Sequence, residues 1–237
     1  MIKVENIDVY GFEHAVRAMR NPMNSWNKSD SEYRDVYKPS HDGTCAVYDG
    51  KRCFIGEKDL GLMSNLFKAG TEHRTYARMI MVWMDIEAPL YWWKEMDRYT
   101  VGKSQVSCST MHKIHAKEFT MDDFSCEHLP LTVGDGDHIW YNDEYPDAPQ
   151  EVLSYTVSAL NLYRKKYLET KDKKYWWWMI QLLPHSYNQR RTICMSYEVV
   201  FKIIKERTGH KLDEWNDFVS ILKELPYVKE IMEGMPS

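Results

Sequence analysis

The stretch MIMVWMDIEAPLYWWKEMDRY, Met79 to Tyr99, decides the fold of this chain. Its first part, Met79 to Ile86, is apolar at nearly every position, which is typical of a strand covered on both faces. Pro89 follows at a position where a helix can begin, because an N–H in the first turn of a helix has no partner within the helix. The pattern predicts a buried strand that leads directly into a helix over 90–99.

The spacing of apolar residues on either side of this stretch predicts further elements. We expect a strand over 2–9, then helices over 12–19, 59–68 (ended by Gly70), 153–167, 195–207 and 215–225. Residues 21–40, rich in Asn, Ser, Asp and Pro, are expected to form a loop. The predicted fold class is α+β, rich in helices around a small central β-sheet.

The segment TCAVYDGKRCFIG, Thr44 to Gly56, predicts a β-hairpin. Asp49-Gly50 suits the positive φ angles of a type I′ turn, with a short β-prone run on each side. Cys45 and Cys53 would then lie nearly opposite each other. Because no second Cys/His pair follows at ligand spacing, we interpret them as two thiols and expect no metal site.

Length and charge limit the classes of function. The 237 residues can bury one core, so we expect a single domain over 1–237, with a loop or insertion at about 120–150. No apolar run approaches the roughly 20 residues of a membrane span, and the start, MIKVENIDVY, lacks a signal-peptide pattern, so a cytoplasmic protein is expected. The net charge of -4 argues against direct binding to nucleic acid.

Aromatic residues are abundant, at 14% of the chain. They predict a large core, a subunit interface or a stacking site. The three consecutive residues Trp176, Trp177 and Trp178 cannot share one face of a helix. We therefore expect at least one of them to reach a neighbouring subunit.

A polar tract follows the predicted helix and gathers groups that can bind an anion. Arg98 offers a planar fork of donors, Lys103 a point charge, Gln105 an amide and Cys108 a thiol. A strand and a helix that deliver such a tract provide a rigid base for a site.

These residues resemble the flavin-dependent thymidylate synthases, the ThyX family. The family carries a strand ending in Ala-Pro, a helix, Arg-His-Arg, seven residues and a Ser. Here Ala88-Pro89, Arg98-Tyr99-Thr100 and Cys108 follow in the same register. Upstream, His73 and Thr75 match the family's His-x-Thr/Ser element.

The resemblance implies a pyrimidine deoxynucleotide as substrate, C5 one-carbon transfer with FAD and a reduced folate, and a homotetramer with shared active sites. It places the following residues around the nucleotide: Arg98, Lys103, Gln105, Arg190 and Arg207, with Arg191 as a further candidate. It places the following residues on the cofactor side: His73, Thr75 and Arg78. Leu183-Pro184 resembles the family's Leu-Pro before the helix that reaches Arg207.

The chain departs from the family at residues that do chemistry. The family's His and Arg after Arg98 become Tyr99 and Thr100, and a later Arg becomes Thr110. The flavin-side Glu becomes Arg78, and Asn-Ala-Arg becomes Ser196-Tyr197-Glu198, so two charges are reversed. The departures predict an altered flavin site.

Cys108 has two interpretations. A thiolate near cations could add to C6 of a pyrimidine and activate C5, which makes Cys108 a catalytic candidate together with Arg98. The alternative is a small unreactive thiol in place of a Ser. At the level of function, the alternatives are a catalytically inactive ThyX-fold scaffold or nucleotide-binding module, and an unrelated α+β protein.

Overall fold

The computed structural model describes residues 2–131, 134–135, 138–139 and 148–234, which form two compact units. The first unit holds Met1–Glu5, Asp85–Arg98 and Gln105–Thr192. The second unit holds Asn6–Met84, Tyr99–Ser104 and Ile193–Ser237.

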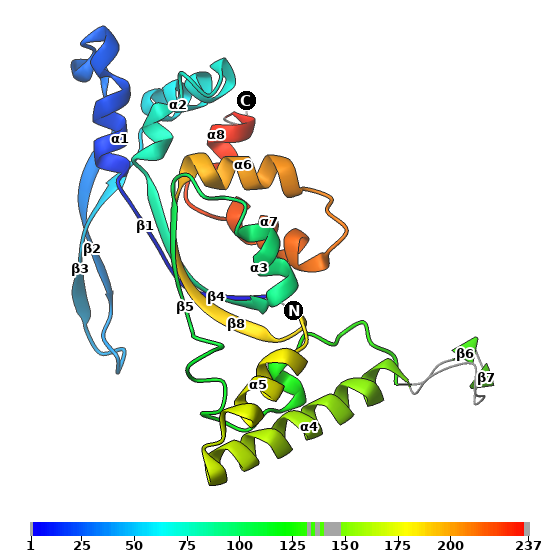
Figure 1. Ribbon diagram of the computed structural model, residues 1–237. Helices are drawn as coiled ribbons and strands as arrows, with labels where there is room; N and C mark the ends of the chain where they lie inside the picture. Colours follow the sequence, from blue (N-terminus) through cyan, green and yellow to red (C-terminus); the bar gives the residue numbers. More distant parts are fainter. Residues whose placement is uncertain (1, 132–133, 136–137, 140–147, 235–237) are drawn as a thin grey trace. The chain divides into compact units, whose positions relative to one another are not determined.

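A four-stranded sheet confirms the predicted α+β class (Figure 1). Its strands are β1 (Lys3–Tyr10), β4 (Met81–Pro89), β8 (Asn188–Ser196) and β5 (Lys103–Ser107), in the order β1-β4-β8-β5. Each strand contributes residues to both units. The expectation of one domain over 1–237 stays a prediction.

The first unit is built on α3 (Leu90–Met96) and a helical hairpin of α4 (Pro149–Thr170) and α5 (Lys173–Leu182) (Figure 1). Helix α3 follows β4 directly, as predicted, and Pro89 is its N-cap. The remaining short elements are η4 (Met121–Asp123), β6 (Gly134–Asp135) and β7 (His138–Ile139). Residues 132–133, 136–137 and 140–147 of the predicted 120–150 insertion lie outside the described residues.

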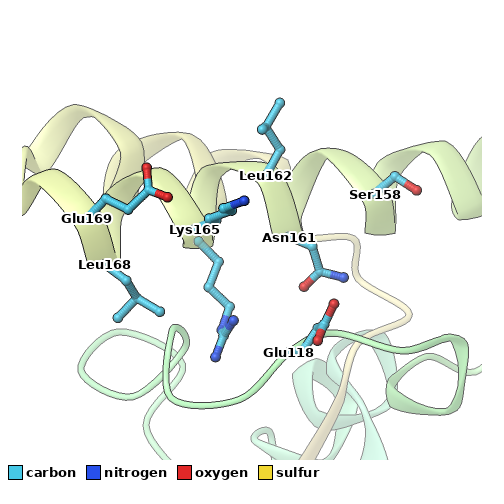
Figure 2. Close-up of a pocket in the computed structure, with 8 residues that line it drawn as sticks. Glu118, Ser158, Asn161, Leu162, Lys165, Leu168 and Glu169 are labelled. Atoms are coloured by element: carbon cyan, nitrogen blue, oxygen red, sulfur yellow. The ribbon is translucent and has the colours of Figure 1, made fainter.

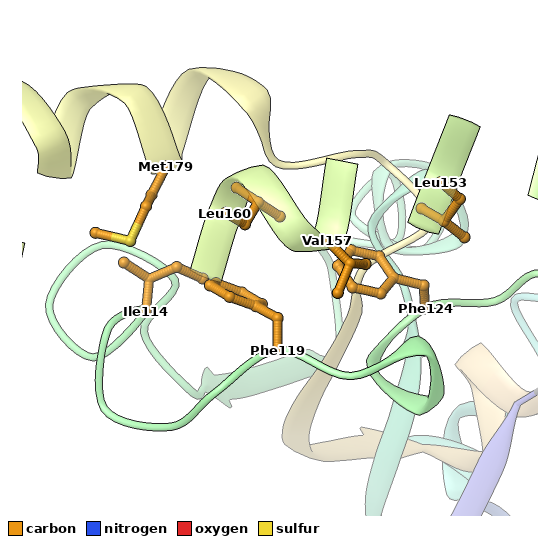
Figure 3. Close-up of a cluster of buried hydrophobic side chains, with 7 residues drawn as sticks. All are labelled: Ile114, Phe119, Phe124, Leu153, Val157, Leu160 and Met179. Carbon is orange, nitrogen blue, oxygen red and sulfur yellow. The ribbon is translucent and has the colours of Figure 1, made fainter. Parts of the chain in front are cut away.

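An apolar cluster joins this helical hairpin to the loop that precedes it (Figure 3). Seven buried residues form the cluster: Ile114, Phe119, Phe124, Leu153, Val157, Leu160 and Met179. The three from the loop lie against the apolar face of α4, whose members recur at helical spacing. Leu160 and Met179 are completely buried, so they mark the centre of this core.

The second unit contains most of the helices. They are α1 (Phe12–Met19), α2 (Glu57–Ala69), α6 (Tyr197–Arg207), α7 (Asp213–Lys223), α8 (Val228–Glu233), and the 3-10 turns η1 (Asn21–Met23), η2 (Trp26–Lys28) and η3 (Thr75–Arg78). Aromatic rings link them edge to face, with centroids 4.9 Å apart for Phe67 and Phe201 and 5.6 Å apart for Phe12 and Tyr197. Gly70 caps α2, as predicted.

A two-stranded ribbon of β2 (Glu32–Pro39) and β3 (Ala46–Phe54) corrects the predicted hairpin (Figure 1). Asp49-Gly50 is not the turn: β3 runs through it, and the register shifts there because Val36 faces Gly50 whereas Tyr37 faces Tyr48. Gly50 has a φ of 105°. A positive φ angle at a glycine is compatible with a β-bulge as well as with a type I′ turn.

The true turn of the ribbon lies between β2 and β3. Asp42 accepts hydrogen bonds there from Ser40 and Thr44. Cys53 therefore faces Tyr33 across the ribbon and not Cys45, and all five cysteines are free. The predicted loop over 21–40 instead contains two 3-10 turns and β2.

Two strands of the central sheet lie where the sequence predicted other structure. The polar tract after α3 contains β5. Residues 188–196 form β8, although the predicted helix over 195–207 includes the last two of them. Helix α6 consequently begins at Tyr197. Within the described ranges, no helix has the length and apolar character needed to cross a membrane.

Candidate functional site

The first unit brings the polar tract beside strand β8. The backbone N–H of Cys108 donates to the carbonyl of Arg190 at 2.9 Å, and the Gln189 side chain donates to the carbonyl of Cys108 at 2.7 Å. Two of the predicted site residues, Cys108 and Arg190, are thus neighbours through the backbone. We call this group, with Asp97, Gln105 and Arg191, the polar strip.

The Arg191 side chain is held in place by three contacts within the polar strip and the core. Its guanidinium donates to Asp97 at 2.8 Å and to the Gln189 side chain at 2.9 Å. It also lies 4.3 Å from the ring centroid of Trp93, which is completely buried. Gln105 donates to the same Asp97 oxygen at 2.7 Å, so one carboxylate orients both side chains.

Arg190 is held by two carboxylates. It lies 3.1 Å from Glu5 and 2.9 Å from Asp85, whose other oxygen accepts from Thr192 at 2.5 Å. The hydrogen bond with Asp85 raises the pKa of Arg190 above its ordinary value. A phosphate at Arg190 would have to compete with both acids, so the predicted role of Arg190 is the least favoured in the polar strip.

Arg98 and Cys108 are both exposed. Among the described residues, no hydrogen bond or ion pair engages the Arg98 side chain. Arg98 therefore differs from Arg190 and Arg191, whose donors are occupied by internal acceptors. An exposed guanidinium without an internal partner is able to bind an external anion bidentately.

The second unit holds Lys103 and Arg207. Lys103 is half-buried on β5, whereas Arg207 is 9% exposed. The guanidinium of Arg207 donates to the Tyr99 hydroxyl at 3.0 Å and lies 4.4 Å from the ring centroid of Trp215. Tyr99 replaces the family's His, and in this chain it covers Arg207 instead of facing solvent. Burial raises the pKa of Tyr99, and so does its hydrogen bond to Glu206.

The cofactor-side residues His73, Thr75 and Arg78 are all exposed around η3. Between His73 and Thr75 lies Arg74, which no motif of the sequence singles out. Its guanidinium makes a two-pronged pair with Glu198, at 2.8 and 3.0 Å, and both side chains are largely buried. The sequence signal for this pair is the reversed charge at Glu198, because a largely buried carboxylate needs a cation beside it.

A pocket of about 630 Å³ lies along α4 (Figure 2). Asn161 of α4 accepts from and donates to the backbone of Phe119, and Arg164 donates to the carbonyl of His115. These polar groups therefore anchor the loop to the helix. None of the predicted site residues lines this pocket. Within the described part of the chain, no cluster of three His, Cys, Asp or Glu side chains could hold a metal.

Comparison with solved structures identifies the fold. Thymidylate Synthase X (ThyX) of Helicobacter pylori, crystallised with FAD and dUMP, is 16% identical, with a TM-score of 0.59 over 100% of this chain and 94% of that chain. The UMP/dUMP methylase PolB of Streptomyces cacaoi, bound with 5-Br dUMP, is 16% identical, with a TM-score of 0.57 over 98% of this chain and 94% of that chain. No family model and no curated protein matches. The predicted resemblance to the ThyX fold is confirmed.

Proposed function

We propose that this chain binds a pyrimidine nucleotide through Arg98 and Gln105 and transfers a one-carbon unit to C5 of its base, with Cys108 as the nucleophile. Two proteins of this fold, a thymidylate synthase and a UMP/dUMP methylase, carry dUMP or its bromo analogue in their crystal structures. The observation that carries the proposal is the Arg98 side chain, which lies at the position of the family's first Arg, is exposed, and has no partner among the residues that the structure describes.

In this proposal each residue has a separate role. Arg98 binds the phosphate, since a guanidinium fork matches phosphate oxygens. Gln105, oriented by Asp97, lies on the same exposed segment and contacts the base. The Cys108 thiolate adds to C6, which moves the electron pair of the C5–C6 bond to C5, and C5 attacks the methylene carbon of methylenetetrahydrofolate as the bond of that carbon to one folate nitrogen breaks. C5 then loses its proton and the bond to the second folate nitrogen breaks. A hydride from the folate reduces the carbon to a methyl group as the Cys108 thiolate leaves C6, so dihydrofolate is the second product.

FAD does not fit the cofactor-side residues as they stand. The donors of Arg74 are directed to Glu198, and the Glu198 carboxylate lies where the family presents a cation. A cofactor phosphate there would meet a neutralised pair and lose a charge-assisted hydrogen bond, about 1.5 to 3 kcal/mol. We therefore assign no step to a flavin, although His73, Thr75 and Arg78 remain exposed.

The Arg74–Glu198 pair also favours a second candidate, a nucleotide-binding module of the ThyX fold without turnover. The two candidates share the binding step and differ in the product. Incubation with dUMP and methylenetetrahydrofolate should give a C5-modified nucleotide by mass spectrometry if the chain is an enzyme. Binding without any such product would identify the module.

Replacing Arg98 by Met should weaken dUMP binding about tenfold or more in calorimetric titration, because one charge-assisted contact contributes about 1.5 to 3 kcal/mol. Arg17→Met, an exposed arginine on α1, is the matched control and should leave binding unchanged. Cys108→Ser should keep dUMP binding and abolish the product. Equal affinities of wild type and Arg98→Met for dUMP would contradict the proposal.

We further propose that the chain assembles as a homotetramer. Helices α4 and α5 expose apolar side chains: Val152, Tyr155, Leu162, Leu168, Trp177, Trp178 and Leu182. Such a concentration of exposed apolar residues is typical of an interaction surface. Light scattering should give a mass near four chains, and Trp177→Ser together with Trp178→Ser should lower it. A monomer at micromolar concentration would refute the assembly.

A further inference from the structure

A second pocket, of about 580 Å³, lies within the second unit between α2, α6 and α8. Its apolar wall is made by Phe67, Ile204, Val228 and Met232. Ile204 and Val228 are buried, so this wall is part of the core and holds a fixed shape. The volume is within the range of about 300 to 1,000 Å³ that small-molecule pockets have.

Cations surround this apolar wall, in a chain whose net charge is -4. The pocket is lined by Lys68, Arg74, Lys205, Lys223 and Lys229, against one acid, Glu233, among the described residues. Two of the cations have acidic partners, since Arg74 pairs with Glu198 and Lys229 pairs with Glu224.

The other three cations that line the pocket are lysines without an acidic partner among the described residues. In the part of the chain that the structure describes, neither Lys68 nor Lys205 nor Lys223 forms an ion pair. They come from three different helices, α2, α6 and α7, and converge on one cavity. Local pairing along one helix therefore does not explain them.

Helix ends account for part of this arrangement. Each of the three lysines lies in the last turn of its helix, where the partial negative charge of the carbonyl end favours a cation. That charge is only about half a unit for each helix, so it offsets about half of each lysine. The three lysines therefore keep a net positive charge after the partial charges of their helix ends are subtracted. Positive charge beside an apolar wall is typical of a site for an anion with an apolar body.

We propose that this pocket binds a small organic anion, an aryl phosphate in its simplest form. The Phe67 ring and the buried aliphatic residues would contact the apolar body. Lys205 and Lys223, with Lys68, would contact the phosphate. The site uses none of the residues assigned to the pyrimidine nucleotide, so it goes beyond the proposed function and adds a second ligand.

Calorimetric titration of the full chain with phenyl phosphate tests this site. We expect binding that weakens about tenfold in Lys223→Met and in Lys205→Met, since each removes one charge-assisted contact and keeps the aliphatic stem. Binding should also weaken as NaCl rises, because salt screens exposed charges over about 10 Å at 0.1 M. Lys58→Met, an exposed lysine elsewhere on α2, is the matched control and should bind as the wild type does.

Inorganic phosphate and phenol separate the two halves of the ligand. Both should bind more weakly than phenyl phosphate, since each offers only one half. Inorganic phosphate that binds as tightly as phenyl phosphate would overturn the proposed ligand class. Equal affinities in wild type, Lys223→Met, Lys205→Met and Lys58→Met, or no binding of phenyl phosphate at all, would overturn the site. Arg98→Met should leave phenyl phosphate binding unchanged, which separates this site from the nucleotide site.

Discussion

Replacing Asp59 by Asn should destabilise the protein by about 3 to 5 kcal/mol, the usual cost of removing one partner from a buried ion pair. Asp59 is completely buried on α2, and one of its oxygens lies 2.6 Å from the guanidinium of Arg20. For a chain of this size the loss corresponds to a decrease in Tm of roughly 6 to 20 °C. Thermal and urea unfolding measure it.

The second oxygen of Asp59 makes the carboxylate hard to replace. It accepts from the hydroxyl of Ser29 at 2.5 Å and from the hydroxyl of Ser31 at 2.7 Å. The backbone N–H groups of Asp30 and Ser31 also donate to it, each at 3.2 Å. The Asn amide carries only one oxygen, so the variant leaves Arg20 without its counter-charge and several donors without their acceptor.

The contribution of Asp59 to the unfolding free energy should depend on pH. Burial alone would raise the pKa of Asp59, but hydrogen bonds from Ser29 and Ser31 and the pair with Arg20 lower it below its ordinary 3.8. The stabilisation is therefore fully present above pH 3.8 and is lost as the pH falls through the folded-state pKa. The difference in unfolding free energy between wild type and Asp59→Asn should shrink in that acidic range.

Controls separate this effect from a general loss of charge. Glu32→Gln removes an exposed ion pair with Arg34 and should cost at most about 1 kcal/mol. The double variant Arg20→Met with Asp59→Asn should be more stable than Asp59→Asn alone, because it removes the buried charge that Asp59→Asn leaves unpaired. An Asp59→Asn protein as stable as Glu32→Gln at neutral pH would show that the buried pair contributes nothing.

Replacing Trp93 by Ala should cost about 3 to 5 kcal/mol of unfolding free energy and disorder the polar strip. Trp93 is completely buried on α3, and its indole N–H donates to the carbonyl of Gln189 at 2.9 Å. Its ring lies beneath the guanidinium of Arg191. The variant therefore creates a cavity and removes the support of Arg191 at once.

Trp26→Ala is the matched control for Trp93, since Trp26 is 50% exposed. Its loss should be small, because an exposed ring leaves no cavity. Trp93→Phe should give an intermediate loss, since it keeps a ring in the core but leaves the Gln189 carbonyl without its donor, at about 1 to 3 kcal/mol. Urea unfolding that fails to separate Trp93→Ala from Trp26→Ala would refute the supporting role of Trp93.

The departures from the ThyX family were readable in the sequence, but their meaning was not. Tyr99 stands where the family has a His, and the structure shows its hydroxyl accepting from Arg207. Glu198 stands where the family has an Arg, and the structure pairs it with Arg74. Both pairings join residues more than a hundred positions apart, so no local pattern could predict them.

The sequence by itself determined the elements that depend on the spacing of nearby apolar residues and on capping residues. The apolar run after Met79 predicted β4, Ala88-Pro89 predicted the passage into α3, and Gly70 predicted the end of α2, because periodicity and capping act within a few residues. The α+β class followed from the elements predicted along the whole chain, and the ThyX resemblance followed from separate anchors between His73 and Arg207.

Tertiary structure decided what depends on partners distant in the chain. Residues 103–107 and 188–196 became neighbouring strands because each supplies the other's backbone hydrogen bonds, which neither segment reveals by itself. Gly50 permits a turn or a bulge equally, and the pairing of β3 with β2 selected the bulge. The same holds for charge: the sequence supplied the arginines, but only packing decided that Arg190, Arg191 and Arg207 are bound internally while Arg98 faces solvent.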